Sequence, residues 1–252
     1  MKKLQFLIIS FFLFNNLIAQ NLEMGLNIGG SVYSGDIEVN IKNYKPQKRM
    51  NIGAFLRVPL NSAFSLRGQA FHGQFYANEQ KYPTTNYRAS RGLSFNTTYT
   101  ELTARLEWNF LNLDNQFYLE DRDPTIKFYS FAGFGATFFK PITNYTSSQN
   151  VAADKVALDK NAVYSTTAPV LALGAGGKFN ITNTLAVGAE VSGQKPFTDY
   201  LDGISNISSG KTKDYYFFAH LLVSYSFGDG GYSRGSGYVS YKGKRRMGCP
   251  TF

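Results

Sequence analysis

Hydrophobic and polar residues alternate in steps of two along about eight separate stretches of this chain. In the first stretch, Met24, Leu26 and Ile28 fall on one side of an extended backbone, while Glu23 and Asn27 fall on the other. A period of two is typical of a β-strand, because a helix repeats every 3.6 residues. The same split recurs in residues 50–58, 102–110 and 185–191. The chain is therefore constrained to form a sheet with one apolar face and one polar face.

The charged side chains of the predicted strands all fall on the polar face. A hydrophobic core cannot accept so many charges, whereas the lumen of a small transmembrane β-barrel holds polar side chains and its outside meets lipid. A soluble β-sandwich also alternates, but it rarely carries so many potential ion-pair partners on one face and so many aromatics, 16% of the chain, on the other. The predicted lumen charges are Glu23, Arg57, Arg67, Glu101, Arg105, Glu107, Lys127, Lys178 and Glu190.

We thus predict an all-β fold, an eight-stranded antiparallel transmembrane β-barrel over residues 20–228, followed by a basic, Gly-rich periplasmic tail over residues 229–252. Inside the barrel, Glu101, Arg105 and Glu107 come from one strand. We expect each of them to pair with a charge from another strand, such as Arg57, Arg67 or Lys127, because an unpaired buried charge is costly.

The amino terminus resembles an export signal. Lys2 and Lys3 precede an apolar run, and the small residue Ala19 follows it. This order predicts a secretory signal peptide over residues 1–19. A membrane-spanning helix is the rival interpretation, but the run is shorter than the roughly 20 residues that a helix needs. No later segment is long and apolar enough for a helical span, so strands are expected to make any crossing.

Eight strands are predicted at residues 22–33, 50–58, 63–76, 94–110, 125–140, 167–179, 184–193 and 213–228. In the third strand Phe64, Leu66 and Ala70 share a face, whereas Phe71 and Phe75 have the opposite phase, so we expect a β-bulge near Ala70. Short links at 59–62 and 180–183 alternate with long ones at 34–49, 77–93, 141–166 and 194–212. Outer-membrane barrels have short periplasmic turns and long outer loops, which places the long set outside.

One periplasmic link is unusual because it is long and acidic. Residues 111–124 contain Asp114, Glu120, Asp121 and Asp123 against Arg122. The segment is either a solvated loop or an additional periplasmic contact surface.

The basic tail contains six Gly and carries a net charge of +4, with Arg234, Lys242, Lys244, Arg245 and Arg246 against Asp229. It lacks apolar periodicity, so we expect it to become ordered only on binding a partner; a solvated tail without a partner is the alternative. Cys249 is the only Cys of the chain. In an exported protein it is either a free thiol or part of an intermolecular disulfide. The predicted partner-binding residues are Lys242, Lys244, Arg245, Arg246, Cys249 and Pro250.

No catalytic or metal site is predicted, and no cofactor. His220 shares the lumen face with Ser224, from which a lipid hydrolase could be drawn, but a lumen His paired with a carboxylate is the commoner arrangement. The two His and the Cys lack the spacing of metal ligands. We interpret Gly174, Gly176 and Gly177 as room for bulky lumen side chains, not as a phosphate loop. Nucleic acid is not an expected partner for an exported chain; a net charge of +7 after loss of Lys2 and Lys3 suits anionic lipid, lipopolysaccharide or acidic protein.

Three motifs carry a family resemblance: residues 33–37 (YSGDI), 197–205 (FTDYLDGIS) and 246–250 (RMGCP). Together they are similar to the PorG-like outer-membrane proteins of the Bacteroidetes type IX secretion system, and the resemblance covers the mature chain. It implies a non-enzymatic accessory barrel in the outer membrane of a Gram-negative, Bacteroidetes-type bacterium. It also implies that the barrel anchors a periplasmic ring of PorK-like lipoprotein and PorN-like protein. The alternative is a stand-alone small barrel of the OmpA or OmpX type, acting in surface contact or envelope stability.

Overall fold

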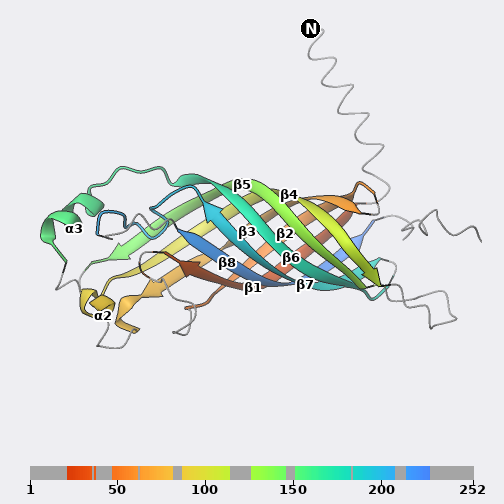
Figure 1. Ribbon diagram of the computed structural model, residues 1–252, viewed down its shortest axis with the longest axis horizontal. Helices are drawn as coiled ribbons and strands as arrows, with labels where there is room; N and C mark the ends of the chain where they lie inside the picture. The colour runs from red at the N-terminus through yellow and green to blue at the C-terminus, as the bar shows by residue number, and fades with distance from the viewer. Residues whose placement is uncertain are drawn as a thin grey trace, which may run out of the picture.

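Eight strands close into an antiparallel barrel in which each strand pairs with its sequence neighbours and β8 pairs with β1 (Figure 1). The computed structural model describes residues 22–35, 37, 47–61, 63–81, 87–113, 126–145, 151–182, 184–207 and 214–227. The predicted fold is confirmed, and the predicted strand bounds lie within four residues of the observed ones. The strands are β1 (Glu23–Ser34), β2 (Arg49–Pro59), β3 (Phe64–Asn78), β4 (Ser94–Leu113), β5 (Ile126–Asn144), β6 (Thr167–Asn180), β7 (Leu185–Pro196) and β8 (Tyr215–Ser226).

Large apolar side chains cover the outside of the barrel, as the alternation predicts. Leu26 is 62% exposed, Phe134 73% and Leu221 65%, although these residues lie in the middle of paired strands. Near one end, Trp108 and Phe110 pack together on β4, and Tyr225 and Phe227 do so beside β8. An apolar band with aromatic residues at its border is the lipid-facing surface of an outer-membrane barrel, so the chain is an integral membrane protein of this type.

The predicted bulge in β3 is wrong. β3 pairs with β4 without a register shift from Phe64 to Asn78, and its residues alternate between inside and outside throughout. Phe71 and Phe75 keep the inward phase of Arg67 and are 1% exposed. They are apolar because this part of the lumen is lined by aromatic rings, so hydrophobicity alone does not identify the outer face here. The register shift lies instead between Asn109 and Leu111 of β4.

The two ends of the barrel differ as predicted. At one end, tight turns connect β2 to β3 and β6 to β7; Asn61 Oδ1 accepts backbone N–H groups of Ala63 and Phe64, and Thr182 Oγ1 accepts that of Leu185. This is the periplasmic end by the loop-length rule. At the opposite end, Figure 1 shows the two α-helices, α2 (Tyr87–Arg91) and α3 (Ala153–Lys160). A 3-10 helix, η1 (Glu79–Lys81), directly follows β3. No helix in the described ranges is both long and apolar enough to cross a membrane.

The predicted signal peptide, residues 1–19, and the predicted tail, residues 229–252, lie outside the described residues. The same holds for most of the acidic link, since residues 114–125 are not described.

Candidate functional site: the closed lumen and its outer cap

Seven charged side chains form one continuous chain of ion pairs across the periplasmic half of the lumen. All nine charges predicted for the lumen are buried, at 9% exposure or less. In order, the chain of ion pairs runs Lys178–Glu23–Arg57–Glu107–Arg67–Glu190–Arg105, with N–O distances from 2.5 to 3.2 Å. These residues come from six strands, so the network links the barrel wall across its interior.

Glu190 lies at the centre of the barrel and contacts two arginines. Its Oε2 lies 2.7 Å from Nη1 of Arg67, and its Oε1 lies 2.7 Å from Nη1 of Arg105. The Tyr129 hydroxyl also donates to Oε2, at 3.1 Å. The guanidinium of Arg67 stacks 4.0 Å from the Phe55 ring. Because each charge of the network lies within ion-pair distance of a charge of opposite sign, both signs can occupy a space with almost no solvent exposure.

Glu101 does not pair as expected. No ion pair joins it to a base of another strand in the described part of the barrel; it accepts a 2.6 Å hydrogen bond from the Tyr216 hydroxyl instead. Tyr216 in turn shares a 2.7 Å hydrogen bond with Thr137. Glu101 lies closer to the extracellular end of β4 than Glu107 does, and the lumen residues around Glu101 are aromatic. Lys127 lies opposite Lys178 in the register of β5 and β6 and is buried.

Stacked aromatic rings fill the outer half of the lumen. The Phe75 ring is nearly parallel to that of Tyr99, with ring centroids 4.1 Å apart. The ring centroids of Phe71 and Phe218 lie 5.2 Å apart. Asn51 donates to the Tyr99 hydroxyl at 2.9 Å, so the polar tip of this ring is satisfied. Rings from opposite strands therefore meet in the barrel centre, above the ion-pair network.

His220 lies in this aromatic layer, and its ring forms no hydrogen bond with a carboxylate of the described residues. Its Nε2 is 2.8 Å from Oδ1 of Asn51, and its ring stacks on Phe71 at 4.5 Å. Its hydrogen-bond partner among the described residues is thus an amide and not the expected carboxylate, although Glu190 lies opposite it in the register of β7 and β8. Gly174 and Gly176 make room for bulky lumen neighbours, as interpreted: a Cβ at either position would meet the ring of Phe131 or Tyr129 within 2.7 Å. For Gly177 the interpretation is wrong, because this residue has the outward phase and lies opposite the exposed Phe128.

The last long loop folds back into the outer mouth of the barrel. Leu201 and Ile204 are 0–1% exposed and join the aromatic cluster. Between them Gly203 has φ of +77°, and the Thr143 hydroxyl would clash with a Cβ there, at 2.4 Å. Only glycine adopts this conformation without strain. Thr97 Oγ1 donates to the Leu201 carbonyl at 2.6 Å, which holds the loop against β4.

Two acids fix this cap to the first strand. The Tyr33 hydroxyl lies 2.8 Å from Oδ2 of Asp202 and 2.5 Å from Oδ1 of Asp214. The second oxygen of Asp214 accepts the backbone N–H of Leu201 at 3.0 Å. Tyr33 belongs to the YSGDI motif and Asp202 to the FTDYLDGIS motif, so two motifs far apart in the sequence meet in the cap.

α3 is tied to the same loop through Asp159. Its carboxylate accepts the backbone N–H groups of Ser205, Asn206 and Ile207 at 2.9–3.3 Å, and also the side-chain amide of Asn206 at 2.8 Å. Tyr145 donates from its hydroxyl to the Gly203 carbonyl at 3.1 Å. Burial, together with the nearby Asp159 charge, raises the pKa of Tyr145 to about 12, so the hydroxyl stays protonated at neutral pH.

A second loop, between β3 and β4, is closed by a buried pair. Arg91 contacts both carboxylate oxygens of Glu79, with Nε at 2.9 and 3.0 Å. Glu79 also accepts the backbone N–H of Leu93 at 3.1 Å. Several of the long outer segments are thus packed against one another or against the barrel rim.

The lumen contains three successive layers: the ion-pair network, the aromatic layer and the cap. The sequence identified the first through its charges. It did not identify Tyr33, Asp202, Asp214 or Asp159 as structural residues of the cap, although two of them lie in motifs that it singled out. The predicted partner-binding residues, Lys242, Lys244, Arg245, Arg246, Cys249 and Pro250, lie outside the described part of the chain.

A family model described as "Domain of unknown function (DUF6089)" matches residues 2–232. Among solved structures, the chain is similar to Neisserial surface protein A (12% identity, 81% of this chain and 96% of that chain, TM-score 0.42). It is also similar to Ail, the attachment invasion locus protein of Yersinia pestis, solved with the heparin analogue sucrose octasulfate (13% identity, 82% of this chain and 99% of that chain, TM-score 0.40). A third similar structure is the N-terminal β-barrel domain of Pseudomonas aeruginosa OprF (13% identity, 82% of this chain and 98% of that chain, TM-score 0.38). No curated protein matches the chain in sequence.

Proposed function

The chain belongs to the DUF6089 family, and from that premise and its filled lumen we propose that it is a non-enzymatic accessory barrel of the type IX secretion system in the outer membrane. In this role it anchors a periplasmic ring of PorK-like lipoprotein and PorN-like protein. The observation that carries the proposal is the three-layered filling of the lumen. A filled eight-stranded barrel offers no aqueous channel, so its function lies at its ends and in its extensions.

The basic tail supports a periplasmic binding role. Its +4 charge favours encounter with an acidic protein surface, and the cluster Lys244, Arg245 and Arg246 lies just before Cys249. An oxidising compartment permits an interchain disulfide from this thiol. The RMGCP ending is also part of the resemblance to the PorG-like proteins.

Deletion of residues 229–252 tests the proposal in cells. We expect the truncated barrel to insert normally, as judged by its heat-modifiable mobility, while cargo secretion and retention of the periplasmic ring are lost. Cys249→Ser should remove a reducible high-mass band on non-reducing gels and leave the barrel intact. A tail of equal length with its bases replaced by Ser separates charge from length: if the bases steer binding, this variant should also weaken retention of the ring. Normal secretion by the tail deletion would refute the anchoring role.

A stand-alone barrel that acts through its outer surface is the second candidate. The observation in its favour is the ordered cap, in which Asp159 and Tyr33 tie the outer loops together. A preformed loop surface is what a contact protein needs, because less conformational entropy is lost on binding. If substitutions in the cap alter adhesion or envelope integrity while tail deletion has no effect, this second function is the correct one.

A further inference from the structure

The outer surface of the barrel carries its charges at one end only. Among the described strand residues and those directly adjoining them, the outward-phase cations Lys48, Lys140 and Lys195 all lie at the extracellular ends of β2, β5 and β7. The strand carboxylates Glu23, Glu101, Glu107 and Glu190 all point inward and are buried. The surface at the level of the outer leaflet headgroups is therefore basic.

Two of these lysines lie at an apolar groove on the outside of the barrel. The groove has a volume of about 750 Å³ and spans β6, β7, β8 and β1, with Lys48 in its wall. Its floor contains small residues of neighbouring strands: Gly30 lies opposite Ala219 in the register of β1 and β8, and Ala175 and Gly193 also line the groove. Leu173 and Phe217 form part of the sides. A row of small residues between larger ones produces a channel wide enough for hydrocarbon chains.

Lys195 lies at the extracellular end of the same groove. It follows the groove residue Gly193 by two positions on the same face of β7, and its Nζ lies 5.8 Å from the ring centroid of Tyr215. Neither Lys48 nor Lys195 forms an ion pair with a carboxylate of the described residues. Both side chains can extend along apolar surface and present their ammonium groups at headgroup level.

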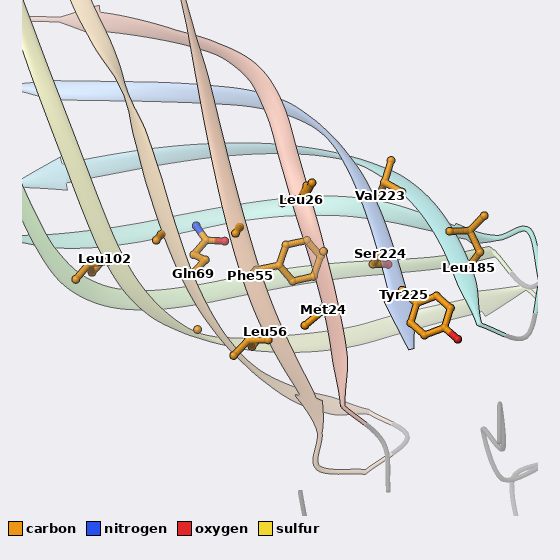
Figure 2. A pocket seen from close by; sticks show the side chains of 14 residues that line it. Met24, Leu26, Phe55, Leu56, Gln69, Leu102, Leu185, Val223, Ser224 and Tyr225 are labelled. Atoms are coloured by element: carbon orange, nitrogen blue, oxygen red, sulfur yellow. The ribbon is translucent and has the colours of Figure 1, made fainter. Parts of the chain in front are cut away.

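A second groove on the same outer surface provides the contrast. It has a volume of about 660 Å³, and Figure 2 shows Met24, Leu56 and Leu102 among the side chains around it. Its lining contains no charged residue. Ordinary acyl chains suffice to fill such a groove, whereas the groove with lysines at its outer end also offers a site for an anionic headgroup.

We propose that the groove over β6, β7, β8 and β1 binds a phosphorylated lipid of the outer leaflet, of the lipopolysaccharide class, with its acyl chains on the small-residue floor and its phosphates at Lys48 and Lys195. Phosphates suit the site because a lysine lies on β7 and another directly before β2, on the two sides of the groove, and the carboxylates of the described strands all point inward. Each lysine near a membrane surface contributes about fivefold to the affinity for anionic lipid, the equivalent of about 1 kcal/mol. This proposal is independent of the secretion role of the tail.

Native mass spectrometry of the full mature chain in detergent, titrated with bisphosphorylated lipid A or with its dephosphorylated form, tests the site. The double variant Lys48→Gln/Lys195→Gln should bind lipid A about 25-fold more weakly and bind the dephosphorylated form as wild type does. Gly30→Leu fills the groove, since a Cβ there meets only the Arg49 carbonyl at 3.8 Å, and should weaken binding of both forms. Its matched control is Gly68→Leu in the second groove, where a Cβ meets nothing within 4 Å.

Each outcome decides the proposal. Selective loss of lipid A in the lysine variant, with Gly68→Leu unchanged, supports it. Unchanged lipid A binding by the lysine variant refutes it, as does equal binding of both lipid forms by wild type. Because both lysines are exposed or half-exposed and lie at the barrel rim, that variant folds even if Gly30→Leu does not, and heat-modifiable mobility verifies folding.

Discussion

Glu190→Gln tests whether the lumen is held by paired charges or merely tolerates them. The substitution preserves shape but removes the only carboxylate that lies within ion-pair distance of Arg105 in the described part of the barrel. Arg67 keeps a longer contact with Glu107, at 3.2 Å. Breaking a buried pair by removing one partner costs about 3–5 kcal/mol, because the remaining charge is left in a medium of low dielectric constant. We expect a loss of unfolding free energy in that range.

The reverse substitution should be milder. In Arg105→Gln, Glu190 retains Arg67 at 2.7 Å and the Tyr129 hydroxyl at 3.1 Å, so Glu190 is not left unpaired. The double variant removes one charge of each sign. Its destabilisation should therefore be smaller than the sum of the single effects by about 1–3 kcal/mol, the coupling range for residues of one ion-pair network.

Urea unfolding of the mature protein in lipid vesicles measures these differences. Trp108 is the only Trp of the chain, lies on the lipid-facing side and is 52% exposed, so its fluorescence reports removal from lipid. Thr103→Val is the control for lumen substitution as such: its buried hydroxyl has no hydrogen-bond partner, so the variant should be neutral or more stable. A coupling below about 0.5 kcal/mol, or a larger loss in Arg105→Gln than in Glu190→Gln, would refute the reasoning.

Three further predictions concern the faces of the barrel and the cap. Leu102→Arg, on the lipid side, should lose about 2–4 kcal/mol in vesicle unfolding, whereas the adjacent lumen substitution Thr103→Ser should change stability little; equal effects would contradict the assigned faces. Asp159→Asn leaves one oxygen where the carboxylate accepts four hydrogen bonds, so limited proteolysis should cleave the outer loops at least tenfold faster while heat-modifiable mobility is retained. The raised pKa of Tyr145 means that its contribution to the cap is complete below about pH 10 and is lost as the pH rises toward 12. Protease sensitivity of the loops should therefore increase across that window in wild type, and Tyr145→Phe should reduce this increase.

The sequence predicted the barrel because lipid imposes a strict rule on one face of each strand. Leu26, Leu102 and Leu221 are exposed to lipid in mid-strand, and their neighbours point inward, so the period of two is visible without any tertiary information. The lumen follows no such rule, since both polar and aromatic side chains can fill it. Phe71 and Phe75 therefore appeared to change phase when they had not, and a bulge was predicted where the register is continuous.

The cap was beyond prediction for a different reason. Residues 197–207 have no alternating pattern, and their placement depends on partners distant in the chain, such as Tyr33 and Thr97. The acids Asp202 and Asp214 resemble ordinary solvated loop residues until the hydroxyl that they share is known. The predicted ion pair of Glu101 is absent from the described barrel for a similar reason. The position of Glu101 along the barrel axis, and hence its aromatic surroundings, cannot be inferred from the order of charges in the sequence.

The charged half and the aromatic half of the lumen both contribute to the rigidity of the barrel between its two ends. The ion-pair network spans six strands at the periplasmic half, so a force or contact applied there is distributed over most of the wall. The aromatic layer and the cap unite the outer half through packing and a few hydrogen bonds to Tyr33 and Asp159. Because close-packed protein interiors transmit strain, a barrel filled in this way suits the proposed role of an anchor that stays rigid while it holds a partner. The proposed anchoring role therefore predicts that loosening the network at Glu190 impairs ring retention even when residues 229–252 are unchanged, which separates rigidity of the barrel from the binding proposed for the tail.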